Sequence, residues 1–343
     1  MIDGIAKLTS REDLTDDEAE AAMRTMMSGK ATEADMAAFL IALKMKGESA
    51  SEISSFAKVM REYSLKVQPK VKGALLDVCG TGGDSSGTFN ISTAAMFAVA
   101  GCGVAVAKHG NRSITSKSGS ADVLEALGAR IDLSPARIES CIEEVGVGFM
   151  FAPNHHPAMK HVMPVRRQLG VRTVFNILGP LTNPAGAQTQ LMGVYDANLT
   201  ETIANVFMKL GLRSALVVHG EPGLDELSTI GLNKISQLSG GRVHTFYLDP
   251  STLGFKGGVL SDLAGGSAAE NAKTIRAILS GGIRDARRDM VVFNAAGGLM
   301  AAGAYDNIRA AIGAASQSID SGAALAKMEE FIAYTRREYG VPG

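Results

Sequence analysis

The sequence contains no tryptophan, and only 5% of its 343 residues are aromatic. Proteins that bind single-stranded nucleic acid stack the bases on aromatic side chains, so this composition argues against such a surface. Lysine and arginine (34) nearly balance aspartate and glutamate (35), which gives a net charge of -1. A nucleic-acid-binding domain usually carries a basic excess. We therefore expect no nucleic-acid partner.

Long apolar runs and closely spaced cysteines are also missing. No uninterrupted apolar run reaches the roughly 18 residues of a transmembrane helix, so we expect no membrane partner. The first residues, MIDGIAKLTSREDL, carry charges throughout and lack the apolar core of a signal peptide. Cys79, Cys102 and Cys141 lie far apart, which is typical of buried thiols in a reducing compartment. Together these absences predict a cytoplasmic protein.

The first 65 residues are predicted to form helices. Thr15 with Glu18, and Ser49 with Glu52, have the spacing of a capping box, and Thr32 marks a further helix start between them. Apolar residues follow each start at helical spacing. Three short helices bury little surface alone, so we expect them to pack on more helix, from later in the chain or from a partner subunit.

After these helices the pattern changes to short apolar runs that alternate with helices. A linker over residues 68–73 contains proline and glycine. Strands are predicted at 74–78, 104–107, 148–152, 191–195, 215–219 and 243–248, the last one an edge or antiparallel strand. Such alternation is typical of a mainly parallel sheet with helices on both faces. We therefore predict the α/β fold class, with a small all-helical domain at 1–67 and a large α/β domain at 73–343.

The first informative loop is DVCGTGGDSSGTFNIST, residues 77–93, which follows the first predicted strand. Its glycines leave backbone N–H groups open to a phosphate in front of a helix N-terminus, although a simple glycine turn has the same composition. Ser85 replaces the glycine or alanine of the dinucleotide fingerprint, and Thr88 replaces the lysine of the P-loop, so neither motif is complete. Asp84 is unusual in an anion-binding loop and suits hydroxyl groups or metal-bound water.

The second loop, KHGNRSITSKSGS, covers residues 108–120. Three cations, several hydroxyls and two glycines suit a strongly anionic ligand such as pyrophosphate. A solvated basic loop is the alternative.

The third loop, GEPGLDELS, covers residues 220–228 and carries Asp225 and Glu226. Adjacent carboxylates after a strand can ligate Mg²⁺, which commonly bridges phosphates. Taken alone, such a pair is more often solvated.

A fourth stretch runs from Arg166 to Pro184. We predict a helix that starts near His156 and closes with Arg166 and Arg167, where arginines more often serve the helix dipole and solvent than a substrate. His155 and His156 are adjacent at the helix start, so their side chains point apart and we do not expect them to form a metal pair.

Together these segments resemble the anthranilate phosphoribosyltransferase family. The resemblance is carried by DVCGTGGD with NIST, KHGNRS with KSGSADVLEALG, VRRQLGVRTVFNILGPLTNP and GLDELS. With ALKMKGES near the start, it covers essentially the whole chain. One departure is Pro222, where the family usually has a short acidic or polar residue; it does not remove a ligand.

The resemblance implies transfer of the phosphoribosyl group of 5-phosphoribosyl 1-diphosphate to the amine of anthranilate, in tryptophan biosynthesis. Pyrophosphate is the second product, and two Mg²⁺ ions are the implied cofactor. Ser92 and Glu226 would hold one ion, and Asp225 with Glu226 the other. The implied donor-binding residues are Gly80, Gly82, Gly83, Asp84, Thr88, Asn90, Ile91, Ser92, Thr93, Lys108, Asn111, Arg112, Ser113, Ser116 and Ser120.

The resemblance also implies an acceptor site and an assembly. Gly80, His109, Asn111 and Arg166 would line the anthranilate route, with Arg166 meeting the carboxylate. The implied fold resembles the nucleoside phosphorylases and phosphoribosyltransferases: a small helical domain, joined by helices from about 165–185, and a large α/β domain. The implied assembly is a homodimer joined through the small domains.

The chemistry of this reaction asks little of a general base. The aromatic amine of anthranilate is already neutral at pH 7, so the harder step is departure of pyrophosphate as positive charge builds on the ribose ring. Metal ions and cations stabilise that leaving group, and holding the two ligands in line supplies much of the rest. We therefore expect no strictly catalytic residue, with Lys108, His109 and Arg166 in supporting roles.

Two other functions remain open on the sequence. A pyrimidine nucleoside phosphorylase shares this architecture but needs neither the acidic pair nor the KHGN run. A non-catalytic nucleic-acid-binding relative would be consistent with the fold, but the net charge and the intact GTGGD and Asp225–Glu226 loops count against it.

Overall fold

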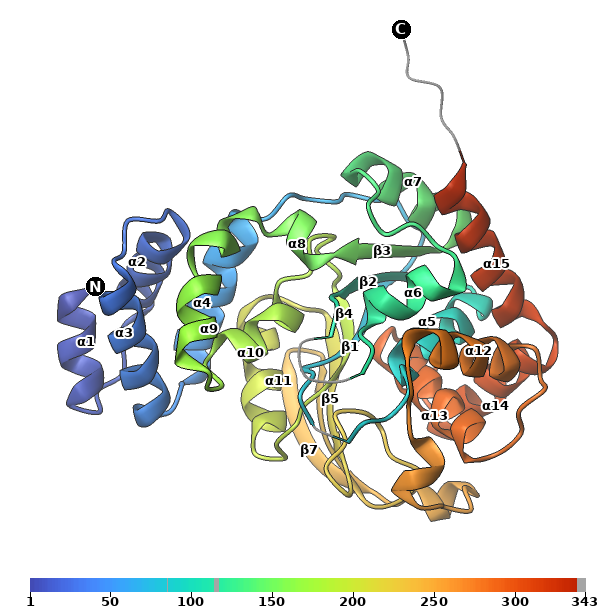
Figure 1. Cartoon of the computed structure of the whole chain (residues 1–343). Helices are drawn as coiled ribbons and strands as arrows, with labels where there is room; N and C mark the ends of the chain where they lie inside the picture. Colours follow the sequence, from blue (N-terminus) through green and yellow to red (C-terminus); the bar gives the residue numbers. More distant parts are fainter. Residues whose placement is uncertain (85, 114–116, 338–343) are drawn as a thin grey trace, which may run out of the picture.

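The computed structural model describes residues 1–84, 86–113 and 117–337 (Figure 1). The N-terminal helices are α1 (Ile2–Thr9), α2 (Asp16–Met27), α3 (Glu33–Lys46) and α4 (Ala50–Glu62). The side chains of the residues before α2, α3 and α4 each accept a hydrogen bond from a backbone N–H of the first turn, and α2 and α4 have complete capping boxes. The helix starts predicted at Thr15, Thr32 and Ser49 are therefore confirmed.

Within the described ranges, the strands form one seven-stranded sheet in the order β3-β2-β1-β4-β5-β6-β7. The strands are β1 (Leu75–Gly80), β2 (Ala105–Gly110), β3 (Val147–Phe151), β4 (Thr189–Gly193), β5 (Ser214–Gly220), β6 (Asn233–Ser239) and β7 (Arg242–Leu248). The first five are parallel, whereas β6 and β7 are antiparallel. The mainly parallel sheet and its antiparallel edge strand are as predicted, but β6 was not predicted because its sequence, NKISQLS, has no continuous apolar run.

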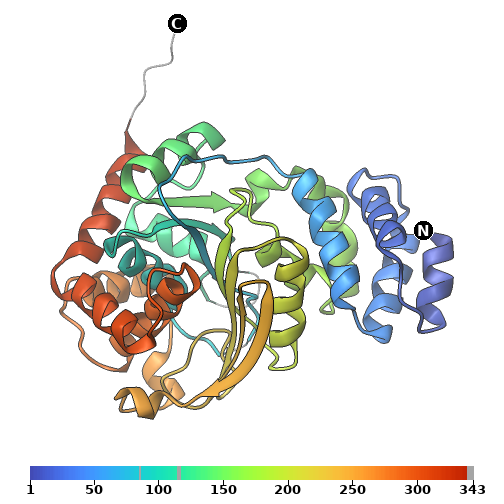
Figure 2. The ribbon, with the colours of Figure 1, turned by 180° about the vertical axis from the view of Figure 1, so that it is seen from behind.

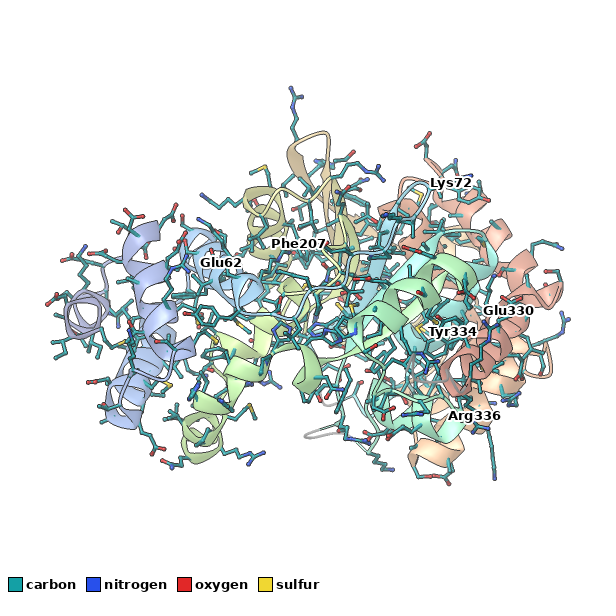
Figure 3. The ribbon with its side chains drawn as sticks, turned by 90° about the horizontal axis from the view of Figure 1, so that it is seen from above. Glu62, Lys72, Phe207, Glu330, Tyr334 and Arg336 are labelled. Atoms are coloured by element: carbon teal, nitrogen blue, oxygen red, sulfur yellow. The ribbon has the colours of Figure 1, made fainter. Side chains whose placement is uncertain are left out.

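Helices cover both faces of the sheet. The helices that follow α4 are α5 (Ile91–Gly101), α6 (Ser120–Leu127), α7 (Pro135–Val145), α8 (Ala152–His155), α9 (Met163–Leu169), α10 (Phe175–Leu178), α11 (Leu199–Lys209), α12 (Ala268–Leu279), α13 (Ala286–Ala301), α14 (Ile308–Asp320) and α15 (Ala323–Arg336). One face packs on α5 and α13, which contact each other extensively, and α11 packs on the other face. Phe207 of α11, labelled in Figure 3, is fully buried there.

A second hydrophobic core joins the N-terminal helices to later parts of the chain. Apolar residues of α2, α3 and α4 share this core with Val165 of α9 and Phe175 of α10, and with Met192 and Val217 on the sheet. Figures 1 and 2 show α1–α4 at one end of the molecule and the C-terminal helices at the other. The partner helices expected for the N-terminal segment thus come from the same chain, while the domain boundaries at 67 and 73 stay a prediction.

The predicted helix from His156 to Arg167 is wrong in its extent. A 3-10 helix covers Pro157–His161, and the α-helix α9 begins only at Met163. Pro164 occupies the first turn of α9, where its missing N–H costs nothing. In the parts of the chain that the structure describes, no helix is both long enough and apolar enough to span a bilayer.

Candidate active site

The loops singled out in the sequence meet at one edge of the sheet. β1, β2 and β5 are parallel and end at Gly80, Gly110 and Gly220, so the loops that follow them leave from the same edge. A Cβ built on Gly80 would lie 2.5 Å from Asp225 Oδ2, and one on Gly193 only 1.6 Å from the Asp225 carbonyl oxygen. The loop of residues 220–228, which we call the acidic loop, therefore crosses directly over the ends of β1 and β4. Only glycine at positions 80 and 193 leaves room for it.

Asp225 is hydrogen-bonded to the first loop, residues 77–93, which we call the glycine loop. Its Oδ2 accepts hydrogen bonds from the Gly82 N–H at 2.7 Å and from the Thr81 hydroxyl at 3.3 Å. Burial, followed by repulsion from the nearby Asp84 carboxylate, raises the pKa of Asp225 to about 7. Burial and the neighbouring Asp225 raise the pKa of Glu226 to about 8. A cation beside Asp225 and Glu226 would therefore stabilise the charged forms of both carboxylates.

Glu226 and Lys108 meet at the start of α5. The Ser92 N–H donates to Glu226 Oε1 at 3.1 Å, and the Lys108 ammonium donates to the Ser92 hydroxyl at 3.2 Å and to the Val78 carbonyl. Lys108 is only 2% exposed. The sequence predicts Lys108 as a donor ligand, whereas the structure directs its ammonium beneath Ser92. From there it partly offsets the buried charge of Glu226.

The residues predicted to bind Mg²⁺ fit that ion. The carboxylates of Asp225 and Glu226 and the Ser92 hydroxyl are hard oxygen donors, and Glu226 lies against Ser92 through the Ser92 N–H. In the described residues no three acidic, histidine or cysteine side chains converge closely enough to hold a metal alone. Mg²⁺ is usually held by one or two carboxylates plus substrate phosphates and water, so this incomplete set suits an ion that arrives with its substrate.

Two buried asparagines, which the sequence analysis missed, fix the acidic loop. Asn294 of α13 accepts from the Leu227 N–H at 2.9 Å and donates to the Leu227 carbonyl at 2.8 Å, an arrangement we call the Asn294 clamp. Asn233 of β6 holds Ser228 in the same two-sided way, at 2.7 and 2.8 Å. The only sequence signal is an asparagine within the otherwise apolar run VVFNAAGG.

The glycine loop turns back on itself before α5. Gly82 and Gly83 have φ of +69° and +83°, a region that favours glycine. The Asp84 carboxylate accepts from the Ser86 N–H at 3.2 Å and from its hydroxyl at 2.6 Å, which caps the turn. Thr88 pairs with Ala264 in an isolated bridge.

The predicted donor residues Asn90, Ile91, Ser92 and Thr93 form the N-terminal end of α5. The Asn90 amide donates to the Ser118 carbonyl at 3.0 Å, so it ties this loop to the second one. Ile91 and Thr93 are buried. The partial positive charge of a helix N-terminus favours an anion at this point.

His109 and His156 face each other in the interior. Their ring centroids are 5.0 Å apart, and within the described residues the Nε2 atom of each ring is buried without a hydrogen-bond partner. Burial lowers the pKa of His156 to about 4 and that of His109 well below its usual value, so both rings are neutral. His155 instead contacts the Leu65 carbonyl through Nδ1 at 3.0 Å. The two adjacent histidines therefore point apart, as expected.

The rest of the second loop is folded against α6. The Arg112 guanidinium pairs with Asp122 and Glu125, so the described structure does not show it as the open cation that the sequence suggested. The Asn111 carbonyl accepts from the Ser120 hydroxyl at 3.3 Å, and the Ser113 N–H donates to Asp122 at 3.0 Å. Ser116, also predicted to bind the donor, lies outside the described residues.

Arg166 and Arg167 differ in their surroundings. The Arg166 guanidinium lies over the Phe175 ring at 5.5 Å, and Nη1 contacts the Met163 sulfur at 3.7 Å. Arg166 is half-buried and burial lowers its pKa, whereas Arg167 is exposed. No described carboxylate lies within ion-pair distance of Arg166, so its charge can meet a ligand.

Comparisons with known proteins agree with this geometry. Residues 2–64 match the family model described as glycosyl transferase family, helical bundle domain, and residues 72–325 match the a/b domain of the same family. The chain is 52% identical over 328 residues to an anthranilate phosphoribosyltransferase from Methanocorpusculum labreanum, covering 96% of each chain.

Two solved structures are also similar. The anthranilate phosphoribosyltransferase of Thermus thermophilus is 41% identical with a TM-score of 0.92, over 98% of this chain and all of that one. The enzyme of Saccharomyces cerevisiae in complex with PRPP and Mg is 29% identical with a TM-score of 0.89, over 97% of each chain. The chain therefore belongs to the anthranilate phosphoribosyltransferase family.

Proposed function

We propose that this protein transfers the phosphoribosyl group of 5-phosphoribosyl 1-diphosphate to the amine of anthranilate, in tryptophan biosynthesis. The products are N-(5-phosphoribosyl)anthranilate and pyrophosphate. The observation that carries the proposal is the meeting of the glycine loop, the start of α5 and the acidic pair Asp225–Glu226 at one sheet edge. The family membership supports the same reaction.

The donor is assigned to this meeting point. The backbone N–H groups around Gly82 and Gly83 and the N-terminus of α5 suit its phosphates, because both present fixed partial positive charge. Asp84 suits ribose hydroxyls or metal-bound water. Lys108 and Arg112 would contact the donor only by leaving their present partners. The remaining proposed donor residues are Gly80, Thr88, Asn90, Ile91, Ser92, Thr93, Asn111, Ser113, Ser116 and Ser120.

Two Mg²⁺ ions are assigned to the acidic side of the site. Ser92 and Glu226 would hold one, and Asp225 with Glu226 the other. When bound, the ions supply Lewis-acid stabilisation of the departing diphosphate. The support is the set of hard oxygen donors, whose charged forms are disfavoured by burial and mutual repulsion without a cation, together with the PRPP and Mg complex of the yeast relative.

The acceptor is assigned to the side of the site that carries Arg166, with Gly80, His109 and Asn111. The Arg166 guanidinium would hold the anthranilate carboxylate by charge-assisted hydrogen bonds. His109 is neutral, so it can orient the acceptor by a hydrogen bond without repelling positive charge on the ribose. The aromatic amine is neutral near pH 7, so attack needs position rather than a strong base.

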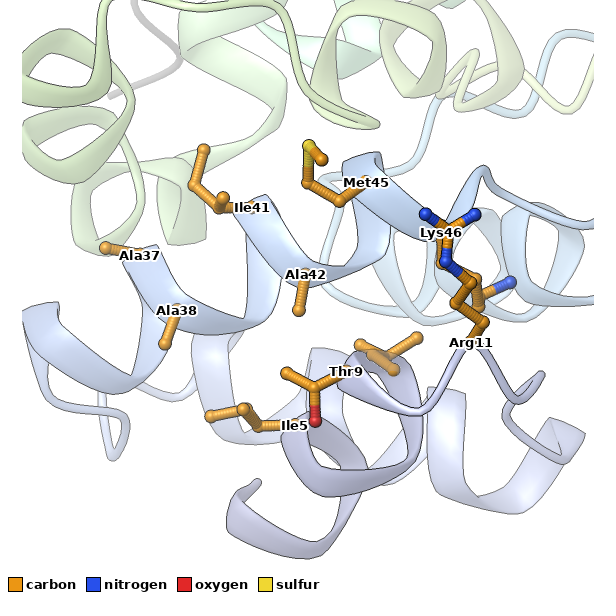
Figure 4. Close-up of a pocket in the computed structure, with 10 residues that line it drawn as sticks. Ile5, Thr9, Arg11, Ala37, Ala38, Ile41, Ala42, Met45 and Lys46 are labelled. Carbon is orange, nitrogen blue, oxygen red and sulfur yellow. The ribbon is translucent and has the colours of Figure 1, made fainter.

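We also propose a homodimer joined through the N-terminal helices. A cavity of about 620 Å³ between α1 and α3 is lined mostly by apolar side chains, including Ile5, Ile41 and Met45 (Figure 4). Met45 of this cavity is 68% exposed, and Ile2 at the start of α1 is 73% exposed. A second copy is the partner that fits, because a two-fold interface pairs such a patch with itself. A Met45→Glu variant should sediment as a monomer, whereas an unchanged dimer would contradict this interface.

The reaction is tested by the fluorescence of anthranilate. Fluorescence should fall only when the donor and Mg²⁺ are both added, with one pyrophosphate released per anthranilate consumed. Phosphorolysis of a pyrimidine nucleoside without anthranilate turnover would identify a nucleoside phosphorylase instead. Binding of nucleic acid without turnover would identify a non-catalytic relative.

A cytoplasmic location is proposed as well, because all three cysteines of the described chain are free thiols, as is usual in a reducing compartment.

A further inference from the structure

Arg172 lies outside the residues assigned to either substrate, in the short turn between α9 and α10. Its guanidinium donates through Nη2 to the carbonyl oxygen of Gly83 in the glycine loop. The same guanidinium lies over the ring of Tyr195, with 4.4 Å between Cζ and the ring centroid. Arg172 therefore connects the turn beside the acceptor helices to the loop assigned to the donor.

Gly82 and Gly83 have no side chains with which to anchor themselves. The Gly82 N–H is held from one side by Asp225, and the Gly83 carbonyl is held from another side by Arg172. A trans peptide bond points its carbonyl and the next N–H in opposite directions. Fixing the Gly83 carbonyl therefore fixes the direction of the Asp84 N–H, a backbone donor of the kind that holds phosphate.

Tyr195, on which Arg172 stacks, is tied to the same loop. The Tyr195 N–H donates to the Thr81 hydroxyl at 3.2 Å, and the Thr81 N–H donates to the Gly193 carbonyl at 3.0 Å. A planar guanidinium stacked on an aromatic ring keeps a defined orientation, whereas an ammonium does not. The ring thus orients the arginine that holds the Gly83 carbonyl.

The turn that carries Arg172 is itself held by two hydrogen bonds. The Lys44 ammonium of α3 donates to the Arg172 carbonyl at 2.7 Å, and the Thr173 N–H donates to the Asn176 side chain at 3.0 Å. Arg166 lies on α9, the helix that directly precedes this turn. The supports of the acceptor side and of the glycine loop therefore belong to one piece of structure.

We propose that Arg172 is a positioning residue for the phosphoribosyl donor: stacked on Tyr195, it holds the Gly83 carbonyl so that the glycine loop is already ordered when the diphosphate binds. Ordering two glycines costs backbone entropy, and a loop held in advance does not pay that cost on binding. The inference rests on the proposed function in that the bound molecule is a phosphorylated sugar diphosphate.

The test measures donor binding directly, by titrating 5-phosphoribosyl 1-diphosphate with Mg²⁺ into the full chain without anthranilate. Arg172→Ala should weaken donor binding about fivefold, the effect of losing one exposed charge-assisted hydrogen bond of roughly 1 kcal/mol. The KM for anthranilate and the thermal midpoint should stay near wild type. Arg172→Lys should recover only part of the loss. Arg167→Ala is the matched control on an exposed neighbouring arginine and should match wild type.

Tyr195 separates positioning from direct contact. Tyr195→Leu should weaken donor binding, as Arg172→Ala does, whereas Tyr195→Phe keeps the ring and should bind the donor like wild type. The double variant Arg172→Ala, Tyr195→Leu should bind the donor no more weakly than Arg172→Ala alone. Full additivity would show that Arg172 contacts the donor independently of Tyr195 and would overturn the proposal. Donor binding by Arg172→Ala within 1.5-fold of wild type would overturn it as well. Failure of the wild-type chain to bind the donor would instead refute the proposed function.

Discussion

Replacing Arg166 by alanine is expected to weaken anthranilate binding far more than replacing the adjacent Arg167. The Arg166 guanidinium is half-buried over Phe175, and no described carboxylate neutralises it. Arg167 is one residue further along α9, about 100° around the helix, and exposed. The two arginines therefore cannot both face one pocket, although they are neighbours in sequence.

The size of the effect follows from the contact that would be lost. A guanidinium that holds a carboxylate in a partly buried site contributes roughly 2–3 kcal/mol. Arg166→Ala should therefore raise the KM for anthranilate by roughly 30- to 150-fold. Arg166→Lys should rescue poorly, because a point charge cannot reproduce the planar fork.

Steady-state assays at saturating donor, with anthranilate varied, measure this effect. The KM for the donor should change little, and thermal midpoints of both variants should show that α9 remains folded. Arg167→Ala should alter the anthranilate KM by only a few-fold. A larger effect at Arg167 than at Arg166 would refute the orientation of α9, and an effect of Arg166→Ala on the donor alone would move the acceptor site elsewhere.

Three further outcomes are expected. Asp225→Asn combined with Glu226→Gln should abolish turnover at every Mg²⁺ concentration with the fold intact by circular dichroism; near-normal activity would remove the metal assignment. Asn294→Ala, which removes the Asn294 clamp, should raise the Mg²⁺ concentration for half-maximal activity about tenfold. Thr335→Val, at a distant buried position, should leave that concentration unchanged. Equal responses of the two variants would contradict the role of the clamp in positioning the acidic pair. Glu52→Ala removes one of the two carboxylates paired with Lys46 and leaves the buried Leu14 N–H without its acceptor. It should lower the free energy of unfolding in urea by about 2–3 kcal/mol; a loss below about 1 kcal/mol would contradict that estimate.

The fold was largely predictable because its signals are local. Thr15, Thr32 and Ser49 cap helices through side chains that lie within one turn of the N–H groups they bind. The meeting of three loops follows from parallel strands, whose carboxyl ends share one edge. β6 gave no such signal, because its polar and apolar residues are mixed and its place beside β5 depends on tertiary contacts.

The details of the site were less predictable because they depend on distant residues. The sequence shows Lys108 and Arg112 as cations in a loop, but not that Lys108 is buried beneath Ser92 or that Arg112 pairs with α6. The clamp on Leu227 comes from Asn294, 67 positions along the chain. Residue types can indicate the chemistry of a site, but the three-dimensional structure is needed to show which charges are open to a ligand.

The central claim, that the acidic pair and the glycine loop together hold a metal–diphosphate, is tested most directly by a crystal structure of the complex with the donor and Mn²⁺, located by anomalous scattering. We predict one Mn²⁺ at about 2.0–2.2 Å from oxygens of Ser92 and Glu226, in the range for a six-coordinate ion of this type. A second should contact Asp225 and Glu226, with the diphosphate between the ions and the backbone of Gly82 and Gly83. Mn²⁺ and diphosphate bound away from Asp225 and Glu226 would contradict the account.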